Sequence, residues 1–182
     1  MVLFVNYCPR EHSRTRYLAG RLLEKFDSYE ELELYGTPLS PLDRDSLEYR
    51  TRLIGQGEYS DGMFALAKQF AAADVIVIAA PYWDLSFPSL LKIYLENIYV
   101  TGIVSRYGED GRPVGLCRAK KLYYVTTAGG PLDERFGYAY IRALAQDAFG
   151  IRSTALIKAE MLDVVGADPD AILEKAAAEI RL

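Results

Sequence analysis

The sequence is poor in the residues that build disulfide and metal sites. It has two cysteines, Cys8 and Cys117, and one histidine, His12, among 182 residues. The cysteine spacing matches no zinc or redox motif, and no segment resembles an export signal, so we expect free thiols in a reducing cytoplasm. One histidine supplies neither a zinc centre nor a Ser-His-Asp triad well, and both chemistries are therefore disfavoured.

Long apolar runs and an excess of positive charge are also missing. The longest apolar run, Val75 to Pro81, is far shorter than the roughly 18 residues of a membrane-spanning helix. Acidic residues outnumber basic ones by 25 to 21, which argues against a general nucleic-acid binder. With 51% hydrophobic and 25% charged residues, the composition is that of a globular protein. We therefore expect one domain over residues 1–182, without membrane insertion or nucleic-acid binding.

Five segments have the patterns of β-strands. Three of them are continuous apolar runs, which are typical of strands buried on both faces of a parallel sheet. One alternates charged and apolar residues, as a half-exposed edge strand does. The five predicted strands are Val2–Val5, Glu31–Tyr35, Val75–Ala80, Leu122–Val125 and Thr154–Ala159.

Helical stripes of apolar residues lie between these strands. Asp133 is expected to cap the fourth helix and Gly150 to end it, and Asp168-Pro169 is a strong signal for the start of the last helix. Residues 36–57 contain two prolines and many charges, and we expect a loop with at most one irregular helix there. The stripes themselves are Leu18–Phe26, Met63–Phe70, Leu90–Ile98, Ile141–Phe149 and Ile172–Ile180.

Alternating strands and helices predict an α/β fold. We expect a three-layer sandwich in which a five-stranded parallel sheet of order 2-1-3-4-5 carries helices on both faces. One segment, 102–118, breaks the alternation. It contains the turn signal Asp110-Gly111, which predicts a short hairpin or a lid.

In such a sheet, ligands bind beyond the carboxyl ends of the strands, where the strand order reverses. The first predicted loop at this edge, 8–15, joins a strand to a helix N-terminus and carries Ser13, Thr15, Arg10 and Arg14, with Arg16 directly after it. Hydroxyl and backbone donors beside a helix dipole favour an anion. Because neither the dinucleotide nor the Walker glycine pattern is present, a phosphate monoester is favoured. Alternatively, Ser13 is only a helix cap and the arginines form a solvated face.

Two further loops reach the same edge. In Pro81–Pro88, two prolines bracket three aromatic residues, which predicts a rigid, flat apolar wall, or alternatively a hydrophobic plug. In 126–131, Gly129 and Gly130 allow a ligand to approach the backbone closely, unless the segment is a simple turn. The three loops together suit a flat ring with one phosphate tail, which is the shape of flavin mononucleotide (FMN).

Several motifs occur in an order that resembles a known family, the FMN-dependent NAD(P)H:quinone oxidoreductases and azoreductases, which have the flavodoxin-like fold. The motifs are Ala79-Ala80-Pro81-Tyr82-Trp83-Asp84-Leu85-Ser86-Phe87-Pro88 with Leu91-Lys92, then Gly102, Tyr107, Gly111, Gly115-Leu116, Lys120-Lys121, Thr127-Ala128-Gly129-Gly130, Phe149-Gly150-Ile151 and Ala159-Glu160. The resemblance covers nearly the whole chain. It implies a homodimer with the active site at the subunit interface.

The resemblance also implies which residues hold FMN. The phosphate group corresponds to Ser13, Arg14 and Thr15, with Cys8 at the position of a preceding serine, and the ring to the two later loops. The ring-binding residues would be Pro81, Tyr82, Trp83, Asp84, Leu85, Thr127, Ala128, Gly129 and Gly130. The chain departs from the azoreductases at Asp84-Leu85, where Asn-Phe is common, and at Thr127-Ala128, where Ser-Arg is common.

The expected function is hydride transfer from NAD(P)H through bound FMN to a quinone, azo or similar aromatic acceptor, with Tyr82 and Trp83 shaping the acceptor pocket. The flavin carries the chemistry, so no catalytic side chain is assigned. One alternative is a flavodoxin-like electron carrier that does not oxidise NAD(P)H itself. The segment 102–118 argues against a carrier, because it could cover the site. Another alternative is a flavin-free signalling domain of the same topology.

Overall fold

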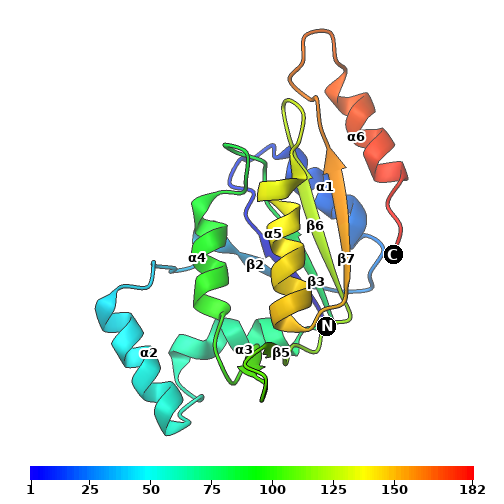
Figure 1. Cartoon of the computed structure of the whole chain (residues 1–182). Coiled ribbons are helices and arrows are strands. Elements are labelled where there is room, and N and C mark those ends of the chain that lie inside the picture. Colours follow the sequence, from blue (N-terminus) through cyan, green and yellow to red (C-terminus); the bar gives the residue numbers. More distant parts are fainter.

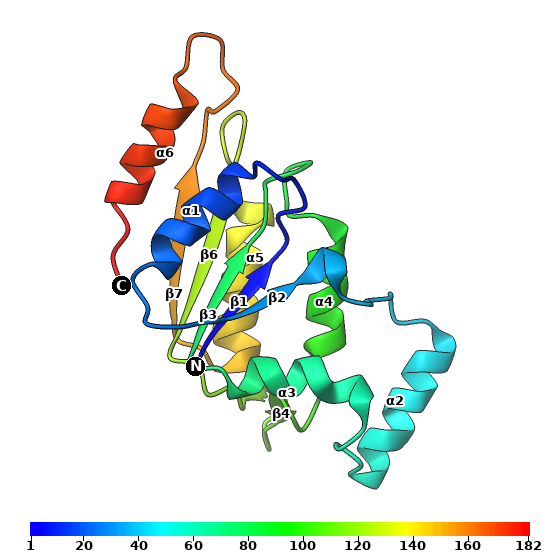
Figure 2. The same ribbon diagram turned by 180° about the vertical axis from the view of Figure 1, so that it is seen from behind.

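The computed structural model describes residues 1–182 and contains a five-stranded parallel sheet at its centre (Figures 1 and 2). The strand order is β2-β1-β3-β6-β7, which is 2-1-3-4-5 when only the strands of this sheet are numbered, so the predicted order is confirmed. The strands are β1 (Val2–Asn6), β2 (Glu30–Glu33), β3 (Val75–Ala79), β6 (Lys121–Thr127) and β7 (Ser153–Ala159).

Helices cover both faces of the sheet, as expected. Successive residues of each strand point to opposite faces, so Leu3 and Val5 join a core of 25 buried residues, while Val2 and Phe4 join one of 17. The smaller core lies under α1 (Arg14–Leu23) and α6 (Pro169–Ala178). The larger core lies under α3 (Ala65–Ala72), α4 (Ser89–Ile98) and α5 (Tyr138–Ala143), and α5 continues as a π-helix over Leu144–Phe149. None of the helices is both long and apolar enough to cross a membrane.

Two helix caps follow the sequence and one does not. Asp168 caps α6 with Pro169 in the first turn, and Gly150 ends the π-helix in the left-handed conformation, both as predicted. The prediction that Asp133 caps the following long helix is wrong, because its carboxylate accepts from Arg135 N–H and caps only a short 3₁₀ turn. Gly137 then interrupts the helical path with φ −114° and ψ −87°, and α5 begins after it.

The prediction of a largely irregular segment over 36–57 is also wrong. Residues Arg44–Gln56 form a regular helix, α2, which Asp43 and Ser46 cap reciprocally and Gly57 ends in the left-handed conformation. Two features explain why the sequence did not indicate helix α2. Its capping box uses serine rather than glutamate at the third position, and only Leu53 is buried, so no apolar stripe marks the helix. The helix stands away from the sheet (Figures 1 and 2).

Segment 102–118 contains a two-stranded antiparallel hairpin, β4 (Ser105–Tyr107) and β5 (Pro113–Gly115). It lies by the amino ends of the sheet strands, near the chain's N-terminus (Figure 1). Cys117 donates its N–H to the Phe149 carbonyl at 3.2 Å, which fixes the hairpin to the end of the π-helix. The hairpin therefore does not cover the carboxyl ends of the five-stranded sheet in the same chain, and it does not disfavour an electron carrier in the way expected from the sequence.

Candidate functional site

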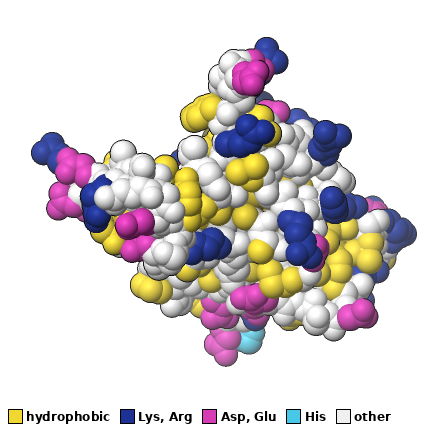
Figure 3. Space-filling model, turned by 90° about the horizontal axis from the view of Figure 1, so that it is seen from below, with side chains coloured by type: hydrophobic (Ala, Val, Ile, Leu, Met, Phe, Trp, Pro, Cys, Tyr) yellow, Lys and Arg dark blue, Asp and Glu magenta, His cyan; other side chains and the backbone are white.

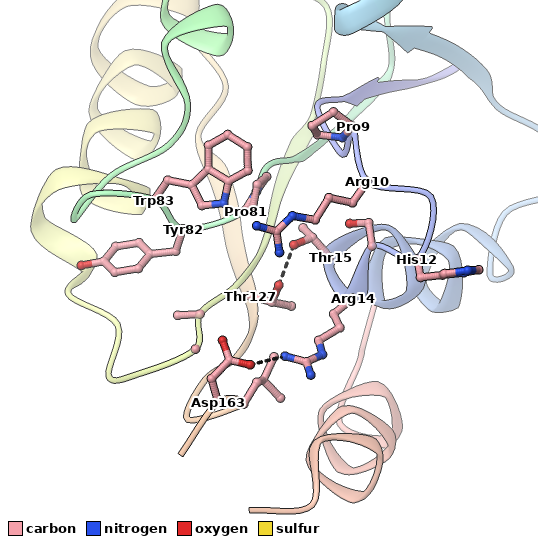
Figure 4. A pocket seen from close by; sticks show the side chains of 14 residues that line it. Pro9, Arg10, His12, Arg14, Thr15, Pro81, Tyr82, Trp83, Thr127 and Asp163 are labelled. Carbon is pink, nitrogen blue, oxygen red and sulfur yellow. Dashed lines mark hydrogen bonds and ion pairs between the residues drawn. The ribbon is translucent and has the colours of Figure 1, made fainter. Parts of the chain in front are cut away.

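A cavity of about 450 Å³ opens at the carboxyl ends of β1, β3 and β6 (Figure 4). Its position is where the strand order reverses, and its volume is in the range of small-molecule sites. Four segments of the chain form its walls. The lining residues are Pro9, Arg10, His12, Ser13, Arg14, Thr15, Pro81, Tyr82, Trp83, Thr127, Ala128, Gly129, Leu162 and Asp163.

The first wall is the loop 8–15 and the start of α1. Ser13 caps α1, because its hydroxyl accepts from the Arg16 N–H at 3.2 Å. The N–H groups of Arg14 and Thr15, in the first turn, donate to no other protein atom. The helix N-terminus therefore presents unpaired donors to the cavity, as the sequence predicted for an anion site.

The arginines of this wall differ in how far carboxylates neutralise them. Arg14 donates to Asp163 at 2.7 Å. Arg16 donates to both carboxylate oxygens of Glu31, at 2.7 and 3.2 Å, and therefore lies turned toward β2. Only Arg10 has no carboxylate partner, and its guanidinium lies 5.9 Å from the centre of the Trp83 ring. The predicted cluster of three free positive charges is therefore reduced to one.

Thr15 and Thr127 connect the first wall to the third. Their hydroxyl oxygens are 2.6 Å apart, and both side chains are buried (Figure 4). One hydroxyl donates to the other, so the pair retains one hydroxyl hydrogen that a ligand oxygen can accept. The two threonines therefore act as a single donor rather than two.

The second wall is the loop after β3. Tyr82 donates its N–H to the Thr127 carbonyl at 3.0 Å, and its hydroxyl accepts from the Asp133 N–H at 3.2 Å. Trp83 packs edge-on against Tyr7 and remains 37% exposed. Tyr82 and Trp83 thus form a fixed aromatic wall. The alternative that this loop is a hydrophobic plug fits only Phe87, which packs against the larger core.

A tight turn at Asp84 and Leu85 follows. Trp83 and Ser86 exchange two backbone hydrogen bonds of 2.9 Å around it, and the two central residues have φ of 51° and 68°. Left-handed backbone is uncommon for aspartate and more so for leucine, so this turn is strained. The N–H groups of both residues donate to no protein acceptor. Their side chains point to solvent and do not line the cavity.

The third wall, 127–130, is fitted closely to a fourth segment that the sequence analysis missed. Asp163 donates its N–H to the Gly129 carbonyl at 2.9 Å, and its carboxylate occupies the place that a Cβ at Gly129 would take. The N–H groups of Gly129 and Gly130 have no protein acceptor. Asp163 could have been found from its position, because it follows the last strand of the sheet at the same edge.

Two other predicted residues lie outside the lining. Gly130 is just beyond Gly129. Cys8 is buried below the loop, where its thiol donates to the Ala79 carbonyl at 3.9 Å. Burial raises the pKa of the Cys8 thiol to about 11, so the group is a neutral thiol at ordinary pH.

Comparison with known proteins identifies relatives over the full length of the chain. A family model described as "Flavodoxin-like fold" matches residues 1–182. FMN-dependent NADH:quinone oxidoreductase 2 of Clostridium acetobutylicum is 37% identical over 94% of this chain and 92% of that protein. The FMN-dependent NADH:quinone oxidoreductase of Clostridium beijerinckii is 34% identical over 96% and 93%.

Solved structures have the same fold. The FMN-dependent NADH-azoreductase from Bacillus anthracis, determined in complex with FMN, superposes with a TM-score of 0.82 at 22% identity, covering 98% of this chain and 94% of that one. The chain therefore belongs to the flavodoxin-like fold family that includes the FMN-dependent NADH:quinone oxidoreductases.

Proposed function

We propose that this protein is a flavin-dependent oxidoreductase that passes a hydride from NADH or NADPH through bound FMN to a quinone, azo or similar aromatic acceptor. The observation that carries the proposal is the set of unpaired backbone N–H groups around the cavity, at Arg14 and Thr15 on one side and at Gly129 and Gly130 on the other. Arg14 and Thr15 have free N–H groups because they begin a helix, and those of Gly129 and Gly130 are free in a turn. Together these donors suit a ligand with acceptors at both ends. The relatives named above support the same cofactor.

The phosphate end of FMN fits the first wall. The N–H groups of Arg14 and Thr15 lie at the positive end of the α1 dipole, and the Ser13 hydroxyl and the Thr15–Thr127 pair add donors. Cys8 would help to set the path of the loop backbone rather than bind the phosphate, because its thiol already donates a hydrogen bond to the Ala79 carbonyl.

The ring end fits the second and third walls. Pro81, Tyr82 and Trp83 supply a flat apolar surface. The unpaired N–H groups of Asp84 and Leu85, in the turn just beyond the cavity lining, would supply donors for a polar ring edge. Across the cavity, Ala128, Gly129 and Gly130 offer mainly backbone to the ring, and Thr127 adds its hydroxyl. Backbone N–H groups would bind the polar atoms of FMN and aromatic side chains would contact its ring. The site therefore needs few charged side chains.

When bound, FMN supplies the redox chemistry, accepting a hydride from the nicotinamide and delivering electrons to the acceptor. The chain's own residues bind and orient. Tyr82 is held by the Asp133 N–H, and Trp83 by its edge contact with Tyr7, so both keep a fixed wall for the acceptor. His12 lies exposed at the rim and has no proton-transfer role in this scheme.

The assembly that supports this function best is a homodimer working in the cytoplasm. On the face seen from below, hydrophobic side chains reach the surface between charged ones (Figure 3). Tyr107 and Val114 of the hairpin and Leu116, which directly follows it, are 66%, 38% and 40% exposed. Contact with a second copy would bury such side chains. This interface lies at the other end of the sheet from the cavity, and it therefore differs from the active-site interface that the family resemblance implies. Light scattering of the purified protein tests the dimer.

Spectroscopy tests the function directly. The protein purified with FMN should be yellow, should bleach when NADH or NADPH is added without oxygen, and should regain its colour when a quinone is added. Bound FMN that neither nucleotide bleaches would identify an electron carrier instead. Failure to bind added FMN would exclude both. In the double variant Ser13→Ala/Thr15→Ala, we expect FMN to dissociate more readily.

A further inference from the structure

Arg10 is the free positive charge of the cavity. Its guanidinium has no carboxylate oxygen within 4.0 Å, whereas Arg14 is paired with Asp163 and Arg16 with Glu31 and Glu33. In Figure 4 the Arg10 side chain extends into the cavity between the Trp83 ring and Thr15. It therefore lies between the aromatic wall and the N-terminus of α1.

The backbone that carries Arg10 is loosely attached. Residues Pro9–His12 make no hydrogen bond to any part of the chain outside the 8–15 loop, through either backbone or side chain. Few hydrogen bonds and high exposure are the properties of segments that change conformation at low cost. Arg10 can therefore move while β1 and α1, on either side of it, stay in place.

Two positions compete for this guanidinium. A cation over an indole at an exposed site favours an equilibrium by about two- to fivefold. A charge-assisted hydrogen bond from arginine to a phosphate favours it by about ten- to a hundredfold, and the planar guanidinium can make two such bonds at once. A phosphate at the N-terminus of α1 would therefore draw Arg10 away from Trp83.

We propose that Arg10 binds the phosphate group of FMN and, in doing so, leaves the face of Trp83 free for the flavin ring. The inference rests on the proposed function. It adds Arg10 to the residues that bind FMN, and it specifies that Arg10 contacts Trp83 before FMN binds and the phosphate group afterwards. Ring binding and phosphate binding become coupled through one side chain, because the ring packs against a surface that Arg10 otherwise occupies. A ligand with the ring but no phosphate would have to displace Arg10 without offering it a new partner.

The first experiment uses the intrinsic fluorescence of Trp83, which is the only tryptophan in the chain. Inorganic phosphate is added to the flavin-free protein, with potassium chloride at equal ionic strength as the salt control. We expect phosphate to give a saturable change in emission that chloride does not give. Arg10→Ala should abolish the change, whereas Arg152→Ala, which removes an exposed arginine just before β7 at the other end of the sheet, should keep it. No response in the unmodified protein, or an unchanged response in Arg10→Ala, overturns the proposal.

The second experiment compares FMN with riboflavin, which has the same ring but no phosphate. In Arg10→Ala the dissociation constant for FMN should rise by about tenfold or more, and that for riboflavin by less than about threefold. Arg10→Lys, which keeps the charge, should recover part of the FMN affinity. If Arg10→Ala weakens both ligands equally or neither, the role of Arg10 is wrong while the proposed function stands. If the unmodified protein binds neither FMN nor riboflavin, both the proposed function and the role of Arg10 are wrong.

Discussion

The hydroxyl groups of Thr15 and Thr127 meet at 2.6 Å although 112 positions separate them in the chain. Thr15 belongs to the first turn of α1 and Thr127 is the last residue of β6, so this bond ties the helix over one face to a central strand of the sheet. Both groups also line the cavity. The same contact therefore stabilises the fold and shapes the wall of the cavity.

Replacing Thr127 by valine should cost stability. The substitution keeps the shape of the side chain but leaves the buried Thr15 hydroxyl without a partner, at a cost of about 1–3 kcal/mol. Urea unfolding of Thr127→Val measures the loss, and Thr51→Val, on the exposed surface of α2, provides the matched control.

The double variant Thr15→Val/Thr127→Val should lose less stability than the sum of the two single variants. Removing both hydroxyl groups leaves neither member of this pair unpaired, so we expect the two effects not to be additive. A strictly additive result would mean that the two hydroxyl groups do not depend on each other.

Gly129 and Gly130 should respond differently to alanine. A Cβ at Gly129 overlaps the Asp163 carboxylate, which would have to move and break its 2.7 Å ion pair with Arg14. A Cβ at Gly130 meets nothing within 4 Å. We expect FMN to dissociate more readily from Gly129→Ala than from Gly130→Ala, as measured by flavin fluorescence after dilution. Adding Asp163→Ala to Gly129→Ala should restore part of the binding, and no rescue would contradict the overlap.

The hairpin should depend on Gly115. A Cβ at this position would overlap the backbone of Phe149 and Gly150, which cannot move aside as a side chain can. Gly115→Ala should therefore destabilise the protein by about 1–3 kcal/mol. Gly55→Ala, inside α2 with open space around it, should instead stabilise by about 0.5–1 kcal/mol. Thermal unfolding of the two variants tests both signs.

Stability should fall at alkaline pH, in part because of Cys8. Burial raises the pKa of this thiol to about 11 in the folded protein, from an ordinary value of 9.0. Between these two values the unfolded chain loses the proton first, so unfolding is favoured increasingly as the pH rises. The loss should reach about 2 kcal/mol at pH 11.

Urea unfolding from pH 8 to pH 11 measures this effect as the difference between the unmodified protein and Cys8→Ala. The variant should lose less stability over this range, because other buried groups continue to titrate but Cys8 no longer does. Parallel curves for the two proteins would show that Cys8 is not protected. Below pH 9 the two curves should run parallel.

The sheet was predictable because its strands carry strong local signals. Continuous apolar runs in β1, β3 and β6 mark buried parallel strands, and alternation in β2 marks the edge. Helix α2 gave no such signal, because a helix that buries only Leu53 has no apolar stripe. Asp133 was misread because a local carboxylate cap looks the same in sequence whether a 3₁₀ turn or a long helix follows.

The position of the cavity was predictable from the sequence, but the pairing of its charged side chains was not. The rule that ligands bind beyond the carboxyl ends of the strands located three of the four walls. The pairing of Arg14 with Asp163 joins residues 149 positions apart, and no local pattern in the sequence indicates it. The same holds for the free state of Arg10, which follows only from knowing where every carboxylate lies.

The hairpin and the loops that line the cavity lie at opposite ends of the five-stranded sheet. This separation means that one end can change without directly altering the other. We therefore expect changes to the hairpin to alter thermal stability and changes to Pro81–Pro88, which line or flank the cavity, to alter the choice of acceptor. Exchanging that loop with the corresponding loop of a relative should therefore transplant acceptor preference into an intact scaffold. The five-stranded sheet and its helices would then stay unchanged while the loop Pro81–Pro88 is exchanged.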